Sequence, residues 1–241
     1  MPTESINGRS IHFQITGDGP QTVVFSHGFL MSHKMFAAQV EALSKTHRVI
    51  VFDHRGHGDS GPCDDPFTLD DLVSDAAALL DALGTGPVHF AGMSTGGFVG
   101  LRLLLTRPDL IASLTLIDTS ASADPPEKMK RYNLLLFLVR FVGMRPLLGQ
   151  VFPLLFGPTF RNDPARSAEN AQWKSYIGGL QKGSIRQFGH AIFGRDDICD
   201  RLRALAAPPP VLILVGEDDI PTPPMEAEKM QAALKGAQLT R

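Results

Sequence analysis

Short apolar runs alternate with longer segments of helical periodicity along the first half of the chain. The apolar runs lie at 11–16, 22–26, 48–52, 88–91 and 114–117, and the helical segments lie at about 32–44, 69–83 and 95–105. Strands that alternate with helices pair in parallel, and the resulting sheet is covered by helices on both faces. The sequence therefore predicts an α/β fold.

The second half of the chain begins with a long segment of a different character. Residues 120–207 contain helical patterns, for example at 127–142 and 169–179, but no clear strand. A strand pattern returns at 211–215, directly after three prolines. This order of elements indicates a helical insertion into an α/β core.

The end of the sequence completes the predicted organisation. A helix is expected near 223–234, and the last residues, 237–241, read as the beginning of another strand. We predict a mostly parallel sheet flanked by helices, with the first part of the core at 1–119. An inserted helical cap would follow at 120–207, and the second part of the core, incomplete, at 208–241.

Composition and charge exclude several classes of protein. Apolar residues make up 43% of the 241 residues, and 23 Lys and Arg stand against 25 Asp and Glu. A net charge of −2 gives no general attraction to nucleic acid or to an anionic membrane. The two cysteines, Cys63 and Cys199, form no disulfide framework or zinc motif. The N-terminus lacks the pattern of a signal peptide, and arginines and prolines interrupt the apolar segment 134–157. We expect a soluble, cytoplasmic protein; self-association into a homo-oligomer is left open.

The segment Gly92-Met-Ser94-Thr-Gly96 contains the first candidate catalytic residue. It follows a predicted strand and opens a predicted helix. A serine on such a sharp turn is held in a strained conformation with its hydroxyl above the sheet, and glycines on either side avoid collisions. The alternative is a glycine-rich packing turn with a capping serine. The context favours a nucleophile.

A second loop lies where it could bind the oxyanion formed when Ser94 attacks a carbonyl group. His27-Gly28-Phe29 follows an earlier strand, so the Phe29 amide is expected to face Ser94. Together with the Thr95 amide at a helix N-terminus, it would form an oxyanion hole. His27 has two possible roles: it contacts the substrate, or it is a loop histidine that bonds to the backbone. We prefer the second interpretation.

The third loop is an acidic one. Gly216-Glu-Asp-Asp219 follows the strand that resumes the core, so a carboxylate there lies at the same edge of the sheet as Ser94. Such a carboxylate orients a catalytic histidine and stabilises its cation. The alternative is a solvated acidic residue that caps the following helix.

In combination, these motifs resemble the α/β-hydrolase fold family, in its branch of esterases, lactonases and cofactor-free haloperoxidases. The resemblance spans nearly the whole chain. It includes the turn Asp53-His-Arg-Gly-His-Gly-Asp-Ser60, which is structural in the family. It implies Ser94 as the nucleophile, Asp219 as the catalytic acid and residues 120–207 as the cap. It implies no metal and no organic cofactor.

The sequence departs from the family in its histidines. The family places a catalytic histidine after the last strand, whereas none of the eight histidines here follows Asp219. Three explanations are open: a C-terminal truncation, replacement by His190 or His27, or ligand binding without turnover. Truncation would expose apolar side chains beside the 32–44 helix.

The predicted cap indicates the type of substrate. Seven of the 15 phenylalanines lie between 120 and 207, and Phe137 and Phe141 are candidates to line an apolar cleft over Ser94. We predict a serine hydrolase of small apolar carboxylic esters or lactones. The alternatives are another chemistry on the same fold (carbon–carbon bond hydrolysis, perhydrolysis or lyase chemistry) or a non-catalytic ligand-binding protein.

Overall fold

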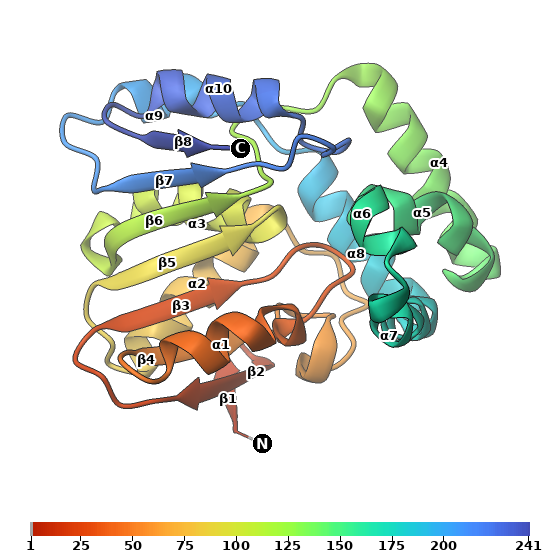
Figure 1. Ribbon diagram of the computed structural model, residues 1–241, viewed down its shortest axis with the longest axis horizontal. Coiled ribbons are helices and arrows are strands. Elements are labelled where there is room, and N and C mark those ends of the chain that lie inside the picture. Colours follow the sequence, from red (N-terminus) through yellow and green to blue (C-terminus); the bar gives the residue numbers. More distant parts are fainter. Residues whose placement is uncertain (1) are drawn as a thin grey trace.

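The computed structural model describes residues 2–241, and within them one eight-stranded sheet runs through the molecule (Figure 1). Its strand order is β1-β2-β4-β3-β5-β6-β7-β8. The strands are β1 (Thr3–Ile6), β2 (Arg9–Thr16), β3 (Thr22–Ser26), β4 (Arg48–Phe52), β5 (Val88–Met93), β6 (Ile111–Ile117), β7 (Val211–Leu214) and β8 (Gln238–Thr240).

The sheet is mostly parallel, which confirms the predicted fold class. β4, β3, β5, β6, β7 and β8 pair in parallel, while β2 pairs antiparallel with β4 and β1 antiparallel with β2. Each apolar run singled out above lies in a strand. The sequence does not predict β1, because three of its four residues are exposed and it has no apolar alternation.

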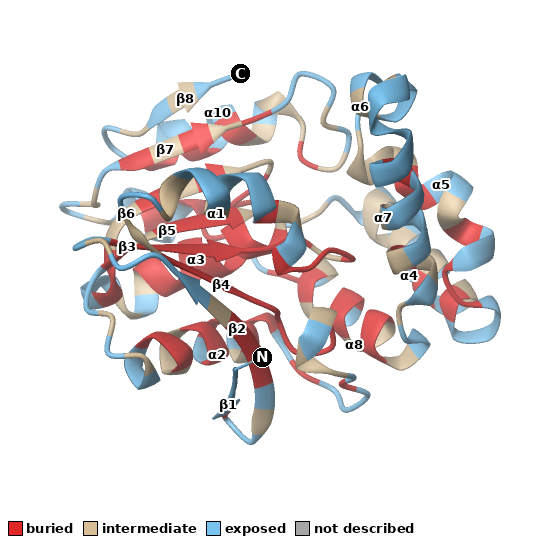
Figure 2. Ribbon diagram, turned by 60° about the horizontal axis from the view of Figure 1, so that its bottom comes forward, coloured by how far each residue is buried: buried red, intermediate tan, exposed pale blue. Residues whose placement is uncertain are grey.

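Helices cover both faces of the sheet, but unequally. α2 (Leu69–Ala82), α3 (Thr95–Thr106) and α10 (Pro224–Ala233) pack into the largest apolar cluster on one face. On the other face, the short helix η1 (His33–Phe36) and α1 (Ala37–Leu43) pack over β3 and β4. Figure 2 shows that the central strands are buried along most of their length.

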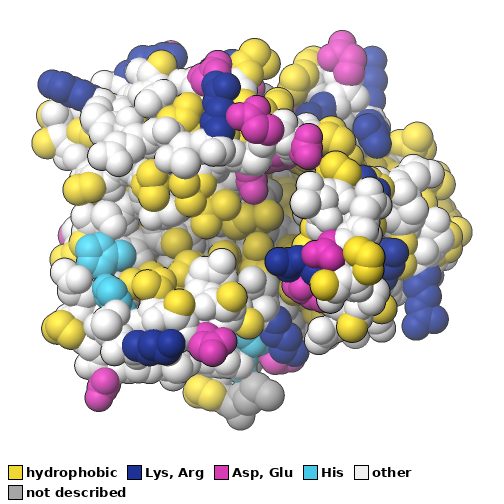
Figure 3. Space-filling view, viewed as in Figure 1, with side chains coloured by type: hydrophobic (Ala, Val, Ile, Leu, Met, Phe, Trp, Pro, Cys, Tyr) yellow, Lys and Arg dark blue, Asp and Glu magenta, His cyan; other side chains and the backbone are white. Residues whose placement is uncertain are grey.

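The face of the sheet beside α1 is only partly covered where it continues toward β7. Met93, Ile117 and Leu214 share this face through the strand register and are half-buried. In Figure 3, apolar side chains are visible in a hollow on this side of the molecule. The apolar side chains on this part of the face are therefore neither fully buried nor fully exposed.

The segment between β6 and β7 is helical, as the sequence indicates. It contains α4 (Pro126–Val142), η4 (Arg145–Leu147), α5 (Leu148–Leu155), α6 (Pro158–Asn162), η5 (Pro164–Arg166), α7 (Ser167–Gly179), α8 (Lys182–Phe193) and α9 (Cys199–Arg203). Most of these helices lie beyond the carboxyl ends of the parallel strands (Figure 1). They have an apolar cluster of their own, which includes Leu136, Val151 and Ile177.

The described residues 2–241 contain no helix that is both long and apolar enough to span a bilayer. The apolar segment 134–157 is divided between α4, η4 and α5.

Candidate active site

Ser94 lies at the junction of β5 and α3 in a strained backbone conformation, with φ 51° and ψ −111°. The flanking glycines make this turn possible. A Cβ atom on Gly92 would lie 2.2 Å from the carbonyl oxygen of Gly96, and a Cβ atom on Gly96 would lie 2.0 Å from that of Ser26. Since a non-glycine residue with positive φ is costly, the fold must hold this serine in place.

Several hydrogen bonds fix the turn. The Ser94 N–H donates to the carbonyl oxygen of Ile117 at 2.9 Å, which ties the turn to β6. The hydroxyl of Thr119 donates to the carbonyl oxygen of Ser94 at 2.7 Å. The turn is therefore anchored on the neighbouring strand and on the segment that follows it.

The loop after β3 lies directly against Ser94. A Cβ atom built on Gly28 would lie 3.4 Å from the Cβ atom of Ser94, so the two backbones approach closely. Within residues 2–241, neither the Phe29 N–H nor the Thr95 N–H has a hydrogen-bond acceptor. Thr95 is buried and is the first residue of α3, where the helix dipole favours negative charge. Two unpaired donors thus flank the serine turn.

A group of buried histidines supports this loop from below. His27 Nδ1 lies 2.8 Å from the Gly28 carbonyl oxygen, and its Nε2 accepts the His54 N–H at 3.0 Å. His57 Nε2 accepts the Leu30 N–H at 3.2 Å. His27 is completely buried and is not among the residues that line the cavity. The backbone-bonded interpretation of His27 thus agrees with the structure, and the proposed substrate contact does not.

The acidic loop after β7 also reaches this edge of the sheet. One carboxylate oxygen of Asp219 accepts the Thr222 N–H at 3.0 Å, and the other accepts the Thr222 hydroxyl at 2.6 Å. Ser94, Asp218 and Asp219 all line the same cavity. Asp219 is half-buried, whereas Asp218 is exposed. The fold therefore brings together the serine and the acid that the sequence motifs indicate.

Sequence reasoning missed a second carboxylate beside this loop. Asp118 directly follows β6, has φ 44° and accepts the Gly216 N–H at 2.8 Å. Burial raises the pKa of Asp118; the Gly216 hydrogen bond opposes this, and the charge of Asp219 adds to it. In the sequence, Asp118 directly follows the apolar run 114–117, and an acidic residue at the end of a parallel strand is the signal that could have pointed to this position.

A cavity of about 270 Å³ opens above Ser94. It lies between the ends of the strands and helices α4, α5 and α8. Its lining is mostly apolar and includes Phe29, Met31, Phe98, Leu135, Leu136, Val139, Met144, Leu147, Val151, Leu154, Phe156, Ile185, Ile192, Phe193 and Ile220.

Four polar residues of the inserted helical segment also line the cavity, and sequence reasoning missed all of them. The buried carboxylate of Asp124 bridges Lys128 Nζ at 2.7 Å and the guanidinium of Arg195 at 2.5 Å. Lys128 also donates to the carbonyl oxygen of Pro221 at 2.5 Å, next to the acidic loop. Burial raises the pKa of Tyr132 to about 12, and Asp124 adds to the effect. Because Arg195 lies 71 positions from Asp124, and Pro221 lies 93 positions from Lys128, no local motif identifies the whole group.

Phe137 and Phe141 are not part of this lining, contrary to the expectation that they line the apolar cleft over Ser94. Their exposed fractions are 58% and 59%, and both lie on the outer side of α4. Other aromatic residues take that place. Phe156 and Phe193 belong to the lining, and Phe193 stacks on Tyr132 with ring centres 4.2 Å apart. Helical periodicity alone does not decide which face of α4 turns inward.

The eight histidines, all of them within residues 2–241, lie outside the cavity lining. His190 is exposed on α8, and His27 is buried with both ring nitrogens engaged. Neither of these candidate replacements therefore faces Ser94.

Comparison with known proteins agrees with this geometry. The sequence profile described as the alpha/beta hydrolase fold matches residues 21–241. The protein named as putative carbamate hydrolase RutD of Azorhizobium caulinodans is 30% identical over 232 residues, covering 92% of this chain and 82% of the relative. The crystal structure of the enol-lactonase from Burkholderia xenovorans LB400 superposes with a TM-score of 0.90 at 27% identity, covering 99% of this chain and 90% of that one. A thermophilic esterase from Thermogutta terrifontis gives a TM-score of 0.86 at 31% identity, with 98% and 86% coverage. The chain belongs to the α/β-hydrolase fold family.

Proposed function

We propose that this protein is a serine hydrolase that cleaves carboxylic ester or lactone bonds, with Ser94 as the nucleophile. One observation carries the proposal. A serine with a strained, positive φ stands at the bottom of an apolar cavity, beside two unpaired backbone amides and a carboxylate loop. A fold that only needed a tight turn here would place glycine at this position, since glycine adopts positive φ without strain.

The arrangement supports acyl transfer in two half-reactions. The Ser94 oxygen attacks the carbonyl carbon and loses its proton to a base. The Phe29 and Thr95 amides donate to the oxyanion, and one such donor is typically worth ~3–4 kcal/mol. The base then protonates the leaving alcohol, and an acyl group remains on Ser94. Water releases the acid through the same tetrahedral chemistry.

Asp219 is the residue that we propose to orient the base. A histidine in a segment following β8 would reach the site from the sheet edge that carries Asp219, because β8 runs parallel to β7. Thr222 already holds both Asp219 oxygens, so the carboxylate has a fixed direction. A fixed carboxylate selects one tautomer of the imidazole and stabilises its cation.

The cavity lining supports a substrate with an apolar acyl or alkyl part. Burial of apolar surface contributes roughly 25 cal/mol per Å², and the side chains around Ser94 are mostly aliphatic or aromatic. The relatives bear the names of a carbamate hydrolase, an enol-lactonase and an esterase, all of which act at an acyl carbon. An apolar lining suits an ester or lactone better than a small polar carbamate. We propose that the helices between β6 and β7 form the cap over this substrate.

Rescue by imidazole tests the proposal on the chain of 241 residues. With no histidine in the cavity lining, added imidazole is expected to act as the base and to raise p-nitrophenyl butyrate turnover at least tenfold above the Ser94→Ala control. The control measures the reaction of free imidazole with the ester. Asp219→Asn is expected to remove most of the rescue, whereas Asp218→Asn, the matched neighbour, retains it. Equal rates for the protein and its Ser94→Ala variant at every imidazole concentration would contradict the assignment.

A further inference from the structure

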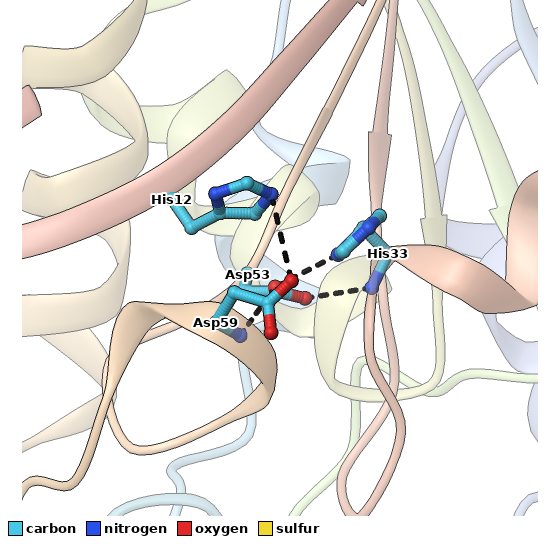
Figure 4. Close-up of side chains that lie close together, drawn as sticks. All are labelled: His12, His33, Asp53 and Asp59. Atoms are coloured by element: carbon cyan, nitrogen blue, oxygen red, sulfur yellow. Dashed lines mark hydrogen bonds and ion pairs between the residues drawn. The ribbon is translucent and has the colours of Figure 1, made fainter. Parts of the chain in front are cut away.

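A group of histidine and aspartate side chains, residue types that can bind metal ions, lies outside the cavity, around the antiparallel part of the sheet. His12 comes from β2, His33 begins η1, Asp53 follows β4, and Asp59 belongs to η2 (Gly58–Ser60). Each residue offers one ligand atom, and these four atoms lie within 4.8 Å of one another (Figure 4). All but Asp59 are buried, and none of the four lines the cavity.

The hydrogen bonds in this cluster fix the protonation of both imidazoles. The side-chain nitrogen of Gln14 lies 3.3 Å from Nε2 of His12 and 3.1 Å from Nε2 of His33. An amide nitrogen only donates, so both Nε2 atoms are unprotonated and turn their lone pairs toward one point. His33 therefore carries its proton on Nδ1, which donates to Asp53 at 2.8 Å. Metal-binding histidines commonly have this arrangement, with one ring nitrogen on the metal and the other on a carboxylate.

The charges in the cluster favour a cation. Asp53 accepts the His33 N–H at 2.7 Å, the His33 ring Nδ1–H at 2.8 Å and the Asp59 N–H at 2.9 Å. Donors of this kind stabilise an ionised carboxylate, so the centre of the cluster carries an acidic group.

A second carboxylate completes the group on its solvent side. Asp59 lies 3.8 Å from Nε2 of His12, and its side chain is 39% exposed. The neighbouring cation, Lys34, is 4.0 Å from Asp59 and is itself 58% exposed, so it neutralises this carboxylate weakly.

We propose that His12, His33 and Asp59, supported by Asp53, bind one divalent transition-metal ion of the zinc class. Two imidazole nitrogens with carboxylate oxygens suit zinc, cobalt or nickel, whereas magnesium and calcium prefer oxygen ligands alone. Zinc–ligand distances are about 2.0–2.2 Å, so the Gln14 amide must move aside and the Asp59 carboxylate must approach. The exposure of Asp59 allows this movement and provides the entry path.

The ion would have a structural effect. It would connect β2 and η1 with the turn after β4, and that turn carries His54 and His57. His57 in turn accepts the N–H of Leu30, in the loop after β3 that packs against Ser94. Metal binding is therefore expected to stabilise the folded protein by mass action, independently of any ester cleavage.

Calorimetric titration of the chelator-treated protein with zinc chloride tests the proposal, together with thermal unfolding and the visible absorption of the cobalt(II) form. One equivalent of zinc is expected to bind and to raise Tm by several degrees. The cobalt(II) form is expected to show the intense visible bands of a low-coordinate site. His12→Gln and Asp59→Asn are each expected to weaken binding at least tenfold. The matched surface variants His190→Gln and Asp200→Asn are expected to bind as the unmodified protein does.

Two results would overturn the site. One is the absence of saturable binding of zinc, cobalt and nickel to the folded protein. The other is unchanged affinity in both His12→Gln and Asp59→Asn. Circular dichroism establishes that each variant is folded, and the exposed position of Asp59 keeps the second variant informative if the first fails to fold.

Discussion

The carboxylate of Asp118, at the end of β6, accepts a hydrogen bond from the backbone N–H of Gly216, just after β7, at 2.8 Å. These residues are 98 positions apart in sequence. The bond fixes the start of the loop that carries Asp219, so the geometry of the candidate acid depends on the neighbouring strand.

The first prediction concerns this bond. Asp118→Ala removes the acceptor for Gly216 and places alanine at a positive φ, so the free energy of unfolding is expected to fall by about 1–3 kcal/mol. Asp118→Asn keeps an acceptor oxygen, tolerates positive φ and relieves repulsion from Asp219, so its stability is expected to stay within about 0.5 kcal/mol. Urea unfolding measures both, with the exposed Asp200→Asn as control. An equal loss in both Asp118 variants would contradict this account.

The glycines of the serine turn give a second prediction. A Cβ atom on Gly96 would collide with the Ser26 carbonyl at 2.0 Å, so Gly96→Ala is expected to cost more than about 2 kcal/mol of stability. Gly149, inside α5, has no atom within 4 Å of the place where a Cβ atom would lie, and Gly149→Ala is expected to leave stability unchanged or raised. Thermal unfolding compares the two. Similar Tm values for both variants would show that the turn is not tightly packed.

The buried histidines predict loss of stability in acid. Burial, and then the charge of His27, lower the pKa of His57 to about 3, while an unfolded chain has a histidine pKa near 6.5. Between pH 3 and pH 6.5, the unfolded state therefore binds more protons than the folded state. The stabilisation that comes from keeping His57 neutral is complete above pH 6.5 and is lost progressively as the pH falls toward 3. Burial also lowers the pKa of His27 and His54, which adds to the effect.

Urea unfolding at several pH values checks this prediction. Stability is expected to fall by several kcal/mol between about pH 7 and pH 4.5, because one group contributes about 1.4 kcal/mol per pH unit in this range. His57→Gln is expected to show a shallower decline, while the exposed His190→Gln shows the same decline as the unmodified protein. A stability that does not change over this range of pH would exclude neutral buried histidines.

The shape of the cavity predicts a change in chain-length preference. Phe193→Ala removes an aromatic ring from the lining and is expected to raise imidazole-dependent turnover of p-nitrophenyl octanoate relative to butyrate several-fold. Phe137→Ala, whose ring lies outside the cavity on α4, is the matched control and is expected to leave the ratio unchanged. A changed ratio in the Phe137 variant alone would place the substrate elsewhere.

Those parts of the fold that depend on local patterns are predictable from the sequence. β3 and β4 begin and end where the apolar runs do, because each run is bounded by polar or glycine residues. The turn at Ser94 is indicated by the spacing of its glycines, and the structure shows that both glycines avoid collisions. Such features are encoded within a few residues.

Features that depend on long-range packing are not predictable in this way. The cluster of Asp124, Lys128 and Arg195 joins residues 71 positions apart, and its lysine meets Pro221 across 93 positions. The orientation of α4, which turns Phe137 outward, follows from packing against α8 and not from its own apolar pattern, which has little amphipathic character. Only the assembled fold determines which side chains meet over Ser94.

The most direct test of the central claim is to map the adduct formed by an alkyl fluorophosphonate in the presence of imidazole. We expect one equivalent of phosphonate on the peptide that contains Ser94, and none on the Ser94→Ala variant. Labelling that persists in Ser94→Ala, or an adduct on a different residue, would contradict the assignment of Ser94 as the nucleophile.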